Sequence, residues 1–201
     1  MIRCLVTDRR RLAGSGASFD HAHRVLLVQL GNAVNSGVDI IQVRERDLEA
    51  GDLAALVAAV VSLVRGTTTR VVVNDRLDVA LACGADGVHL RGDSIPTAEA
   101  RRVVPGGFVI GRSVHTVDEA SAAEGCDYVI AGTVFQSRSK APNAPVLGID
   151  GLRSIVAASR APVLAIGGVT ADRFGAIAAA GAAGVAGIGL FLPFDSPTPA
   201  P

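Results

Sequence analysis

Short runs of apolar residues alternate with longer helical segments along almost the whole 201-residue chain. A strand that returns to the same side of its neighbour needs a crossover, so this alternation predicts parallel pairing. The expected strands are residues 2–7, 38–44, 70–74, 86–90, 108–113, 127–133, 162–167 and 184–188. Eight strand–helix units favour a closed (β/α)8 barrel, or TIM barrel, over an open sheet. No Gly-x-Gly-x-x-Gly pattern follows the first strand, as a dinucleotide-binding open sheet would require.

The predicted barrel is one domain, residues 1–201, in which the closing C-terminal helix is reduced or absent. Three prolines fall within the last five residues, and proline interrupts a helix. Without that helix, apolar barrel surface would stay uncovered. We therefore expect the chain to bury it in a homodimer or a higher homo-oligomer.

Composition narrows the expected partners. Acidic and basic residues are equal in number, 19 each, which gives no reason to expect nucleic acid or an anionic membrane. The three cysteines are far apart and are interpreted as reduced thiols rather than as disulfides or metal ligands. No stretch has the character of a signal peptide or a membrane span, so a cytoplasmic protein without a membrane partner is expected.

Polar residues interrupt the second predicted strand. Alternation places Gln42, Arg44 and the nearby Arg46 on one face, and the apolar residues between them on the other. If the apolar face packs on the helices, the polar face points into the barrel mouth. A guanidinium there requires an anionic partner, which is either a ligand or an internal ion pair with Glu45 or Asp75. Strand C-termini carry the active site in such barrels, which favours the ligand.

Two further strands end in polar groups. Asn74 and Asp75 end the third strand and could bind Mg²⁺ or hold an arginine, or Asp75 could cap the next helix. In the fifth strand, Gly111, Ser113 and His115 share a face. An imidazole at that position suits proton transfer, although a lone histidine is as often structural.

Glycines end the last two strands, at Gly167, Gly168, Gly187 and Gly189. Glycine lets backbone N–H groups approach a ligand, and the loops after strands seven and eight bind phosphate in many such barrels. The alternative is that these glycines only make tight turns. The long polar loop 135–145 is predicted to be a mobile lid that offers Lys140 to an anion, or else a solvated surface loop.

These motifs together resemble the thiamin phosphate synthase superfamily, which includes the thiazole tautomerases of the TenI type. The resemblance runs from Val6 to about Phe191. It is carried by Gln42–Arg46, Asn74–Asp78, Gly84–Leu90, Gly111–His115, Gly132–Lys140 and Ile166–Thr170. It implies a TIM barrel that binds a small phosphorylated thiazole.

The synthase branch joins a pyrimidine pyrophosphate to thiazole phosphate. A resemblance to this branch implies that pyrophosphate and Mg²⁺ are held by four segments. In the family these are a Gln-x-Arg-x-Lys segment, an Asn-Asp pair, a second Asp after the His-Leu pair and a Thr-x-Thr-Lys loop. This chain has Arg46 in place of the lysine, and Ser94, next to Asp93, in place of the second aspartate. Ser137 and Ser139 replace the threonines, and Lys140 is retained. A single carboxylate would hold Mg²⁺ weakly.

The tautomerase branch is the preferred interpretation on these residues. The resemblance implies that His115 moves a proton while a carboxythiazole phosphate tautomer becomes aromatic. Arg44 would face the substrate carboxylate, Ser113 or Asn74 would orient the substrate, and the four glycines would bind its phosphate. This isomerisation needs no metal or other cofactor. The alternatives are the synthase, with Mg²⁺ on Asp75 and Asp93, and a non-catalytic sensor of a thiamin-pathway phosphate.

Overall fold

The computed structural model describes residues 1–14, 16–137, 141 and 143–191. Eight parallel strands hydrogen-bond in sequence order, and β8 pairs with β1, so the barrel is closed. The strands are β1 Ile2–Val6, β2 Ile40–Val43, β3 Arg70–Asn74, β4 Gly87–Leu90, β5 Val109–Val114, β6 Tyr128–Gly132, β7 Val163–Ile166 and β8 Gly184–Gly187. All eight predicted strands are therefore confirmed, with ends that differ by at most two residues.

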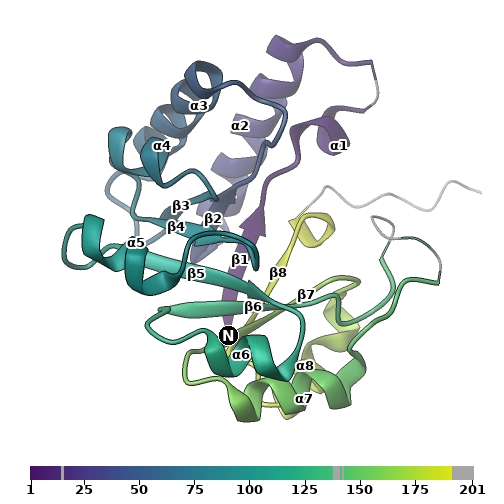
Figure 1. Ribbon diagram of the computed structural model, residues 1–201. Helices are drawn as coiled ribbons and strands as arrows, with labels where there is room; N and C mark the ends of the chain where they lie inside the picture. The colour runs from purple at the N-terminus through teal and green to yellow at the C-terminus, as the bar shows by residue number, and fades with distance from the viewer. Residues whose placement is uncertain (15, 138–140, 142, 192–201) are drawn as a thin grey trace, which may run out of the picture.

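Helices follow the strands and form the outer layer (Figure 1). They are α1 Arg9–Ala13, α2 Phe19–Asn35, α3 Ala50–Leu63, α4 Leu77–Ala82, α5 Thr97–Val103, α6 Val117–Ala122, α7 Gly148–Ala158 and α8 Phe174–Ala179, with short 3-10 helices η1 Ala171–Arg173 and η2 Gly189–Phe191. None of the helices in the described ranges is long and apolar enough to cross a membrane.

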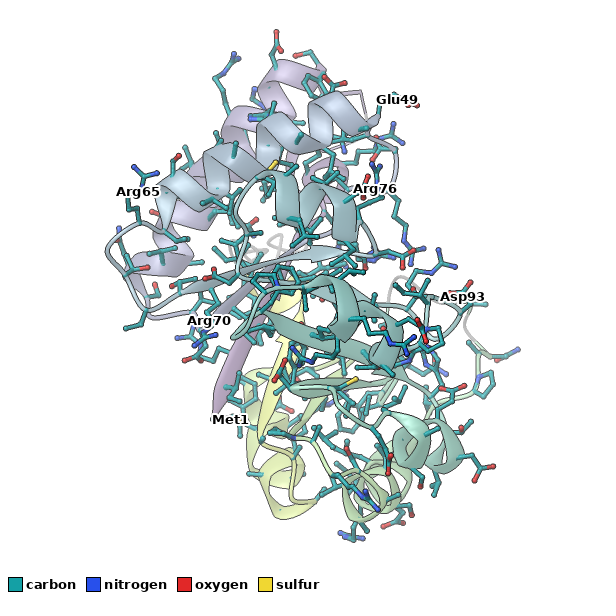
Figure 2. The ribbon with its side chains drawn as sticks, turned by 60° about the vertical axis from the view of Figure 1, so that its left-hand side comes forward. Met1, Glu49, Arg65, Arg70, Arg76 and Asp93 are labelled. Carbon is teal, nitrogen blue, oxygen red and sulfur yellow. The ribbon has the colours of Figure 1, made fainter. Side chains whose placement is uncertain are left out.

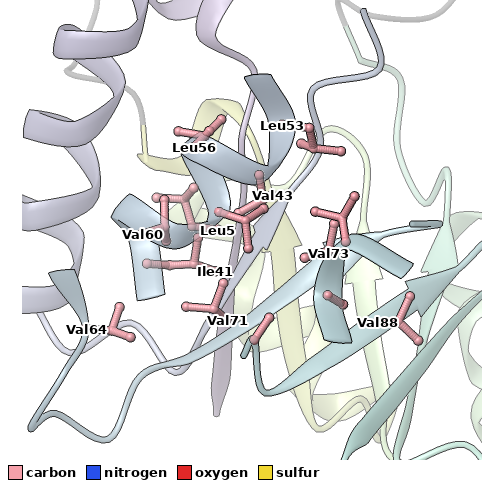
Figure 3. Close-up of a cluster of buried hydrophobic side chains, with 14 of the residues drawn as sticks. Leu5, Ile41, Val43, Leu53, Leu56, Val60, Val64, Val71, Val73 and Val88 are labelled. Atoms are coloured by element: carbon pink, nitrogen blue, oxygen red, sulfur yellow. The ribbon is translucent and has the colours of Figure 1, made fainter. Parts of the chain in front are cut away.

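The apolar packing between strands and helices forms two separate clusters. One joins the outward residues of β1–β4, with Ile110 of β5, to α2, α3, α4 and Ala100 of α5, and Figure 3 shows Leu5, Ile41 and Val43 packed with α3 there. The other joins β5–β8 to α6, α7 and α8, around Leu152 and Ile177. These two helix groups lie on opposite sides of the barrel in Figure 1.

A third cluster fills the barrel itself. Its buried members include Cys4, Val72, Tyr128 and Leu164. The interior is closely packed: a Cβ added to Gly111 would lie 2.1 Å from the ring of Tyr128. Gly111 thus leaves the room that the buried tyrosine occupies.

The end of the barrel follows the expected plan as far as it is described. After β8 the chain makes only η2, and residues 192–201 lie outside the described part. Among the described residues, a hollow of about 400 Å³ lies between α2 and η2, with Leu12, Val25, Val28 and Phe191 in its lining. The homo-oligomer that would cover this surface stays a prediction.

The packing around Gly111 can be tested by substitution. Gly111→Ala should lower the free energy of unfolding by about 1–3 kcal/mol, because the added methyl group overlaps the enclosed Tyr128 ring. Gly51→Ala is the control, since its methyl group enters open space on α3 and should leave stability equal or up to about 1 kcal/mol higher. Urea unfolding measures both. Equal stabilities for Gly111→Ala and the parent would contradict this account of the interior.

Candidate active site

The C-terminal ends of the strands gather at one end of the barrel. In Figure 2, Glu49, Arg76 and Asp93, which follow β2, β3 and β4, lie on one side, whereas Met1 and Arg70 lie on the other. Because the strands are parallel and closed into a ring, every loop that follows a strand opens at this end. We call it the mouth.

Gln42 and Arg44 take the positions that alternation predicted, since Ile41 and Val43 pack outward against the helices. Gln42 is buried, and its Nε2 donates to Asn74 Oδ1 at 3.0 Å. Its Oε1 is also buried and has no hydrogen-bond partner among the described residues. A buried acceptor without a donor is costly, so Gln42 marks a position where a ligand would complete the site.

Arg44 is half-buried at the same place. Its backbone N–H donates to Thr7 Oγ1 at 2.9 Å, and its guanidinium makes no hydrogen bond or ion pair within the described ranges. Burial lowers the pKa of Arg44 and the charge of Arg46 lowers it further, whereas the nearby carboxylates of Asp8 and Glu45 raise it and Arg91 has a smaller lowering effect. A partly desolvated cation without a bonded anion within the described ranges favours an anionic ligand.

The internal ion pairs considered for Arg44 are not formed. Glu45 accepts instead from Arg9, whose Nη1 lies 2.8 Å from Oε2. Asp75 is held by Arg91 and Ser94. Arg46 is exposed on the surface near Arg44, where it adds positive charge.

Asp75 does not cap α4, contrary to one of the alternatives. Arg76 occupies the N-cap position, without a side-chain cap. Asp75 has a φ of 63°, which few non-glycine residues adopt, and its N–H donates to the carbonyl of His89 at 2.9 Å. Its Oδ1 accepts from the Ser94 hydroxyl, and its Oδ2 lies 3.4 Å from Arg91 Nη1. This geometry turns the carboxylate toward the loop after β4.

A buried chain of polar groups that sequence reasoning missed crosses the barrel below the mouth. His89 Nε2 lies 2.9 Å from Ser113 Oγ, and His89 Nδ1 lies 3.1 Å from Tyr128 Oη. Burial lowers the pKa of His89 to about 3, so its imidazole is neutral near pH 7. The sequence does carry a signal for this group. In β4, His89 lies between Val88 and Leu90, which pack outward against the helices, so alternation turns His89 inward. Ser113 thus has a defined partner that orients it.

His115 lies just past the end of β5 rather than on the strand, so its orientation does not follow from alternation with Ser113. Its ring is exposed, and Nδ1 lies 2.5 Å from the carbonyl oxygen of Gly132, at the end of β6. Since a carbonyl can only accept, Nδ1 carries the proton and Nε2 is the free acceptor. Its backbone N–H donates to Glu119 Oε2 at 2.6 Å.

The glycine loops lie at the mouth beside β7 and β8. Gly167 and Gly168 have φ values of 97° and 60°, and a Cβ on Gly168 would lie 2.3 Å from the carbonyl oxygen of Gln136. The N–H groups of Gly168 and Gly189 make no hydrogen bond to another described residue. Arg173 braces this turn, since its Nη1 donates to the carbonyl of Gly168 at 2.6 Å. Gly187 ends β8, and the predicted ligand Lys140 lies outside the described residues.

Fold and site together define a (β/α)8 barrel with basic and polar side chains and glycine turns at the C-terminal ends of its strands. The chain belongs to the thiamine monophosphate synthase (TMP-TENI) family, whose model matches residues 12–191. It is 46% identical over 156 residues to the thiamine-phosphate synthase of Methanoculleus marisnigri, covering 77% of this chain and 74% of that protein. It is 37% identical over 195 residues to that of Roseiflexus castenholzii, covering 96% and 82%.

A solved structure agrees with the sequence relatives. The thiamine phosphate pyrophosphorylase from Pyrococcus furiosus superposes with a TM-score of 0.77 at 33% identity, covering 92% of this chain and 84% of that one. 3-Hexulose-6-phosphate synthase, at 18% identity and a TM-score of 0.64, shares the fold.

The preferred interpretation as a thiazole tautomerase, an isomerase, is wrong on these findings. Relatives at 37–46% identity are named thiamine-phosphate synthase, which is the activity set out above as the alternative. The residues that favoured the tautomerase do not separate the two activities physically. Arg46 is exposed and keeps the charge of a lysine, and His115 lies beyond the strand.

The neutral state of His89 predicts a pH dependence of stability. Its folded pKa of about 3 is below the ordinary value of 6.5, so between these values the unfolded chain binds more protons. Stability is therefore fully present above pH 6.5 and falls as pH decreases toward 3, by up to about 1.4 kcal/mol per pH unit. His89→Gln should flatten this slope in urea unfolding between pH 4 and 7.

The matched control is His21→Gln, on the exposed side of α2. It should keep the slope of the parent. A parental slope in His89→Gln would show that His89 is not the group that resists protonation.

Proposed function

We propose that this chain is a thiamine-phosphate synthase, a transferase that joins a pyrimidine pyrophosphate to thiazole phosphate. One observation carries the proposal: the mouth has two separate anion-binding features, on different strands. Arg44 and its neighbours follow β2, β3 and β4, and the glycine loops follow β7 and β8. A reaction between two phosphorylated substrates requires two such places. The names of the relatives support the same reaction.

In this reaction the bond between the pyrimidine-bearing carbon and a pyrophosphate oxygen breaks, and the carbon bonds to the thiazole. The electron pair of the broken bond leaves with the pyrophosphate, so negative charge grows on that group. A half-buried guanidinium such as Arg44 stabilises this charge more strongly than it stabilises the ground state. We assign Arg44 to the pyrophosphate, with Arg46 adding charge at the edge of the mouth.

The glycine loops are assigned to the thiazole phosphate. Unpartnered N–H groups at Gly168 and Gly189 can donate to phosphate oxygens, and Gly167 and Gly187 allow the backbone to come close. Thiazole phosphate bound there would direct its ring toward the centre of the mouth.

The polar side chains below the mouth are assigned to positioning the two substrates. Ser113, oriented by the neutral His89, and Asn74, bound to Gln42, can hold the reacting rings in register. His115, oriented by the contact of Nδ1 with the Gly132 carbonyl, is assigned to present Nε2 to the substrate, as an acceptor when the ring is neutral.

The synthase family also implies Mg²⁺, for which Asp75 and Asp93 are the predicted ligands. Their geometry does not fit a cation site. Both carboxylates contact the guanidinium of Arg91, and the hydroxyl of Ser94 occupies Asp75 Oδ1. Among the described residues, no group of three or more His, Cys, Asp or Glu side chains could hold a metal ion. No step of the reaction is therefore assigned to a protein-bound metal.

The direct test incubates purified protein with pyrimidine pyrophosphate and thiazole phosphate at graded Mg²⁺ concentrations, and follows thiamin phosphate by chromatography. Formation of thiamin phosphate with release of pyrophosphate supports the proposal. Binding of both substrates without product would indicate a sensor and would overturn it.

The two proposed anion sites predict that two substitutions impair the use of different substrates. Arg44→Gln should lower kcat/KM for the pyrimidine pyrophosphate about 10² to 10³-fold, because charge on the leaving group loses its cation. Gly168→Val should raise KM for thiazole phosphate about tenfold or more, with little change in KM for the other substrate, since the side chain meets Gln136 and fills the turn. Steady-state kinetics with each substrate varied in turn measures both.

Gly66→Val is the control for Gly168→Val. Gly66 also has a positive φ of 81°, but it precedes β3 at the opposite end of the barrel and its Cβ would enter open space. It should keep both KM values. If Gly168→Val and Gly66→Val behave alike, the glycine loop does not bind the thiazole phosphate.

A further inference from the structure

Arg91 lies between the two carboxylates that would be expected to bind a divalent cation. We propose that the guanidinium of Arg91 binds the pyrophosphate group directly, and that it does so in the place of a metal bridge between pyrophosphate and Asp75. The inference rests on the proposed function, because it names how that reaction's pyrophosphate is held. On this inference Asp75 and Asp93 would not hold Mg²⁺ themselves.

The position of Arg91 is fixed by the loop after β4. Its backbone N–H donates to Ser94 Oγ at 2.8 Å, and the same hydroxyl donates to Asp75 Oδ1. Arg112, on β5, holds the loop from beneath through the carbonyls of Gly92 and Ile95, each at 3.0 Å. The residue after β4 is thus held where its side chain reaches the mouth.

Ser94 explains why an arginine fits there. An aspartate at this position would place a second carboxylate beside Asp75 and create a cradle for a dication. The serine brings one hydroxyl and no charge, and it satisfies one oxygen of Asp75. The other oxygen lies 3.4 Å from Arg91 Nη1. A metal ion that used Asp75 would have to displace Ser94 and approach the guanidinium.

The ion pairs of Arg91 are weak enough to be exchanged for a ligand. The side chain of Asp93 is 69% exposed and that of Arg91 is 42% exposed. An exposed pair of this kind contributes little free energy, so pyrophosphate can replace Asp93 on the guanidinium at small cost. Asp75 keeps the side chain oriented meanwhile. An arginine fork also matches two phosphate oxygens at once.

The surroundings independently point to a ligand. Arg44 follows β2, the strand next to the one that Asp75 follows, and it forms no ion pair with a described residue. Beside it, the buried Gln42 carries an acceptor without a donor. Asp75 and Asp93 pair with Arg91, and Asp8 and Glu45 partly offset the charge of Arg44. Neither Arg44 nor Arg46 has an ion-pair partner among the described residues, so these guanidinium groups keep positive charge without a bonded anion. A polyanion would balance that charge, whereas a dication would increase it.

The test measures binding of inorganic pyrophosphate to the purified protein by calorimetry, with EDTA present and then with Mg²⁺. The parent should bind in EDTA. Arg91→Gln should weaken that binding about tenfold or more, and Arg91→Lys should fall between the two, because lysine keeps the charge and loses the fork. Arg102→Gln is the matched control: it removes an equally charged arginine, paired with Glu99 on α5, and should bind as the parent does.

Two results would overturn the inference. One is binding that needs Mg²⁺ in the parent, and the other is equal affinity in Arg91→Gln and Arg102→Gln. Thermal melting checks that each variant is folded. If Arg91→Gln does not fold, the pyrophosphate affinity of Arg91→Lys is compared with that of Arg102→Gln instead.

A second readout does not depend on pyrophosphate. Paramagnetic resonance of Mn²⁺ should show no tight site on the parent protein alone. The double substitution Arg91→Gln, Ser94→Asp should create one, because it removes the cation between Asp75 and Asp93 and adds a third carboxylate beside them. Tight Mn²⁺ binding by the parent would contradict the inference.

The inference and the proposed function fail in different ways. If pyrophosphate binding depends on Arg91 but no thiamin phosphate forms, the proposed function fails and the anion site remains. If thiamin phosphate forms and Arg91→Gln binds pyrophosphate as well as the parent does, the function stands and Arg91 has no such role.

Discussion

Closure of the barrel, through the pairing of β8 with β1, is the constraint on which the site depends. A closed ring of parallel strands has no edge, so each side chain faces either the helices or the interior. The same alternation that packs Ile41 and Val43 against α3 turns Gln42 and Arg44 into the mouth. Burial of the apolar residues thus supplies the free energy that holds a guanidinium in a place it would otherwise avoid.

Much of this arrangement follows from the sequence, because it depends on the two-residue period of strands and on the order of strands and helices along the chain. The eight strands and the inward positions of Gln42 and Arg44 follow from alternation alone. Contacts between strands do not. That His89 meets Ser113 and Tyr128 depends on the register of β4, β5 and β6, and that Arg91 reaches Asp75 depends on a loop anchored by Arg112. The orientation of His115 does not follow from strand alternation either, because β5 ends at Val114.

The choice of reaction was the weakest inference from the residues. The replacements Ser94 and Arg46 favoured the tautomerase in the sequence analysis, whereas the relatives are named thiamine-phosphate synthase. The structure gives a physical reason. Ser94 does not leave a gap: it joins Arg91 and Asp75 in one hydrogen-bonded group. A residue's departure from a family pattern is interpretable only with the neighbours that changed alongside it.

The two outer clusters of apolar residues have a consequence for how such a protein can diverge. The arginines of the mouth stand on strands supported by α2, α3 and α4, and the glycine loops stand on strands supported by α6, α7 and α8. Repacking of one shell need not disturb most of the other, since they meet at β5, which gives Ile110 to one and Val114 to the other, and otherwise share the strand hydrogen bonds and the filling of the barrel. Each half-barrel can therefore drift, and acquire a new ligand preference, while its counterpart keeps the old one.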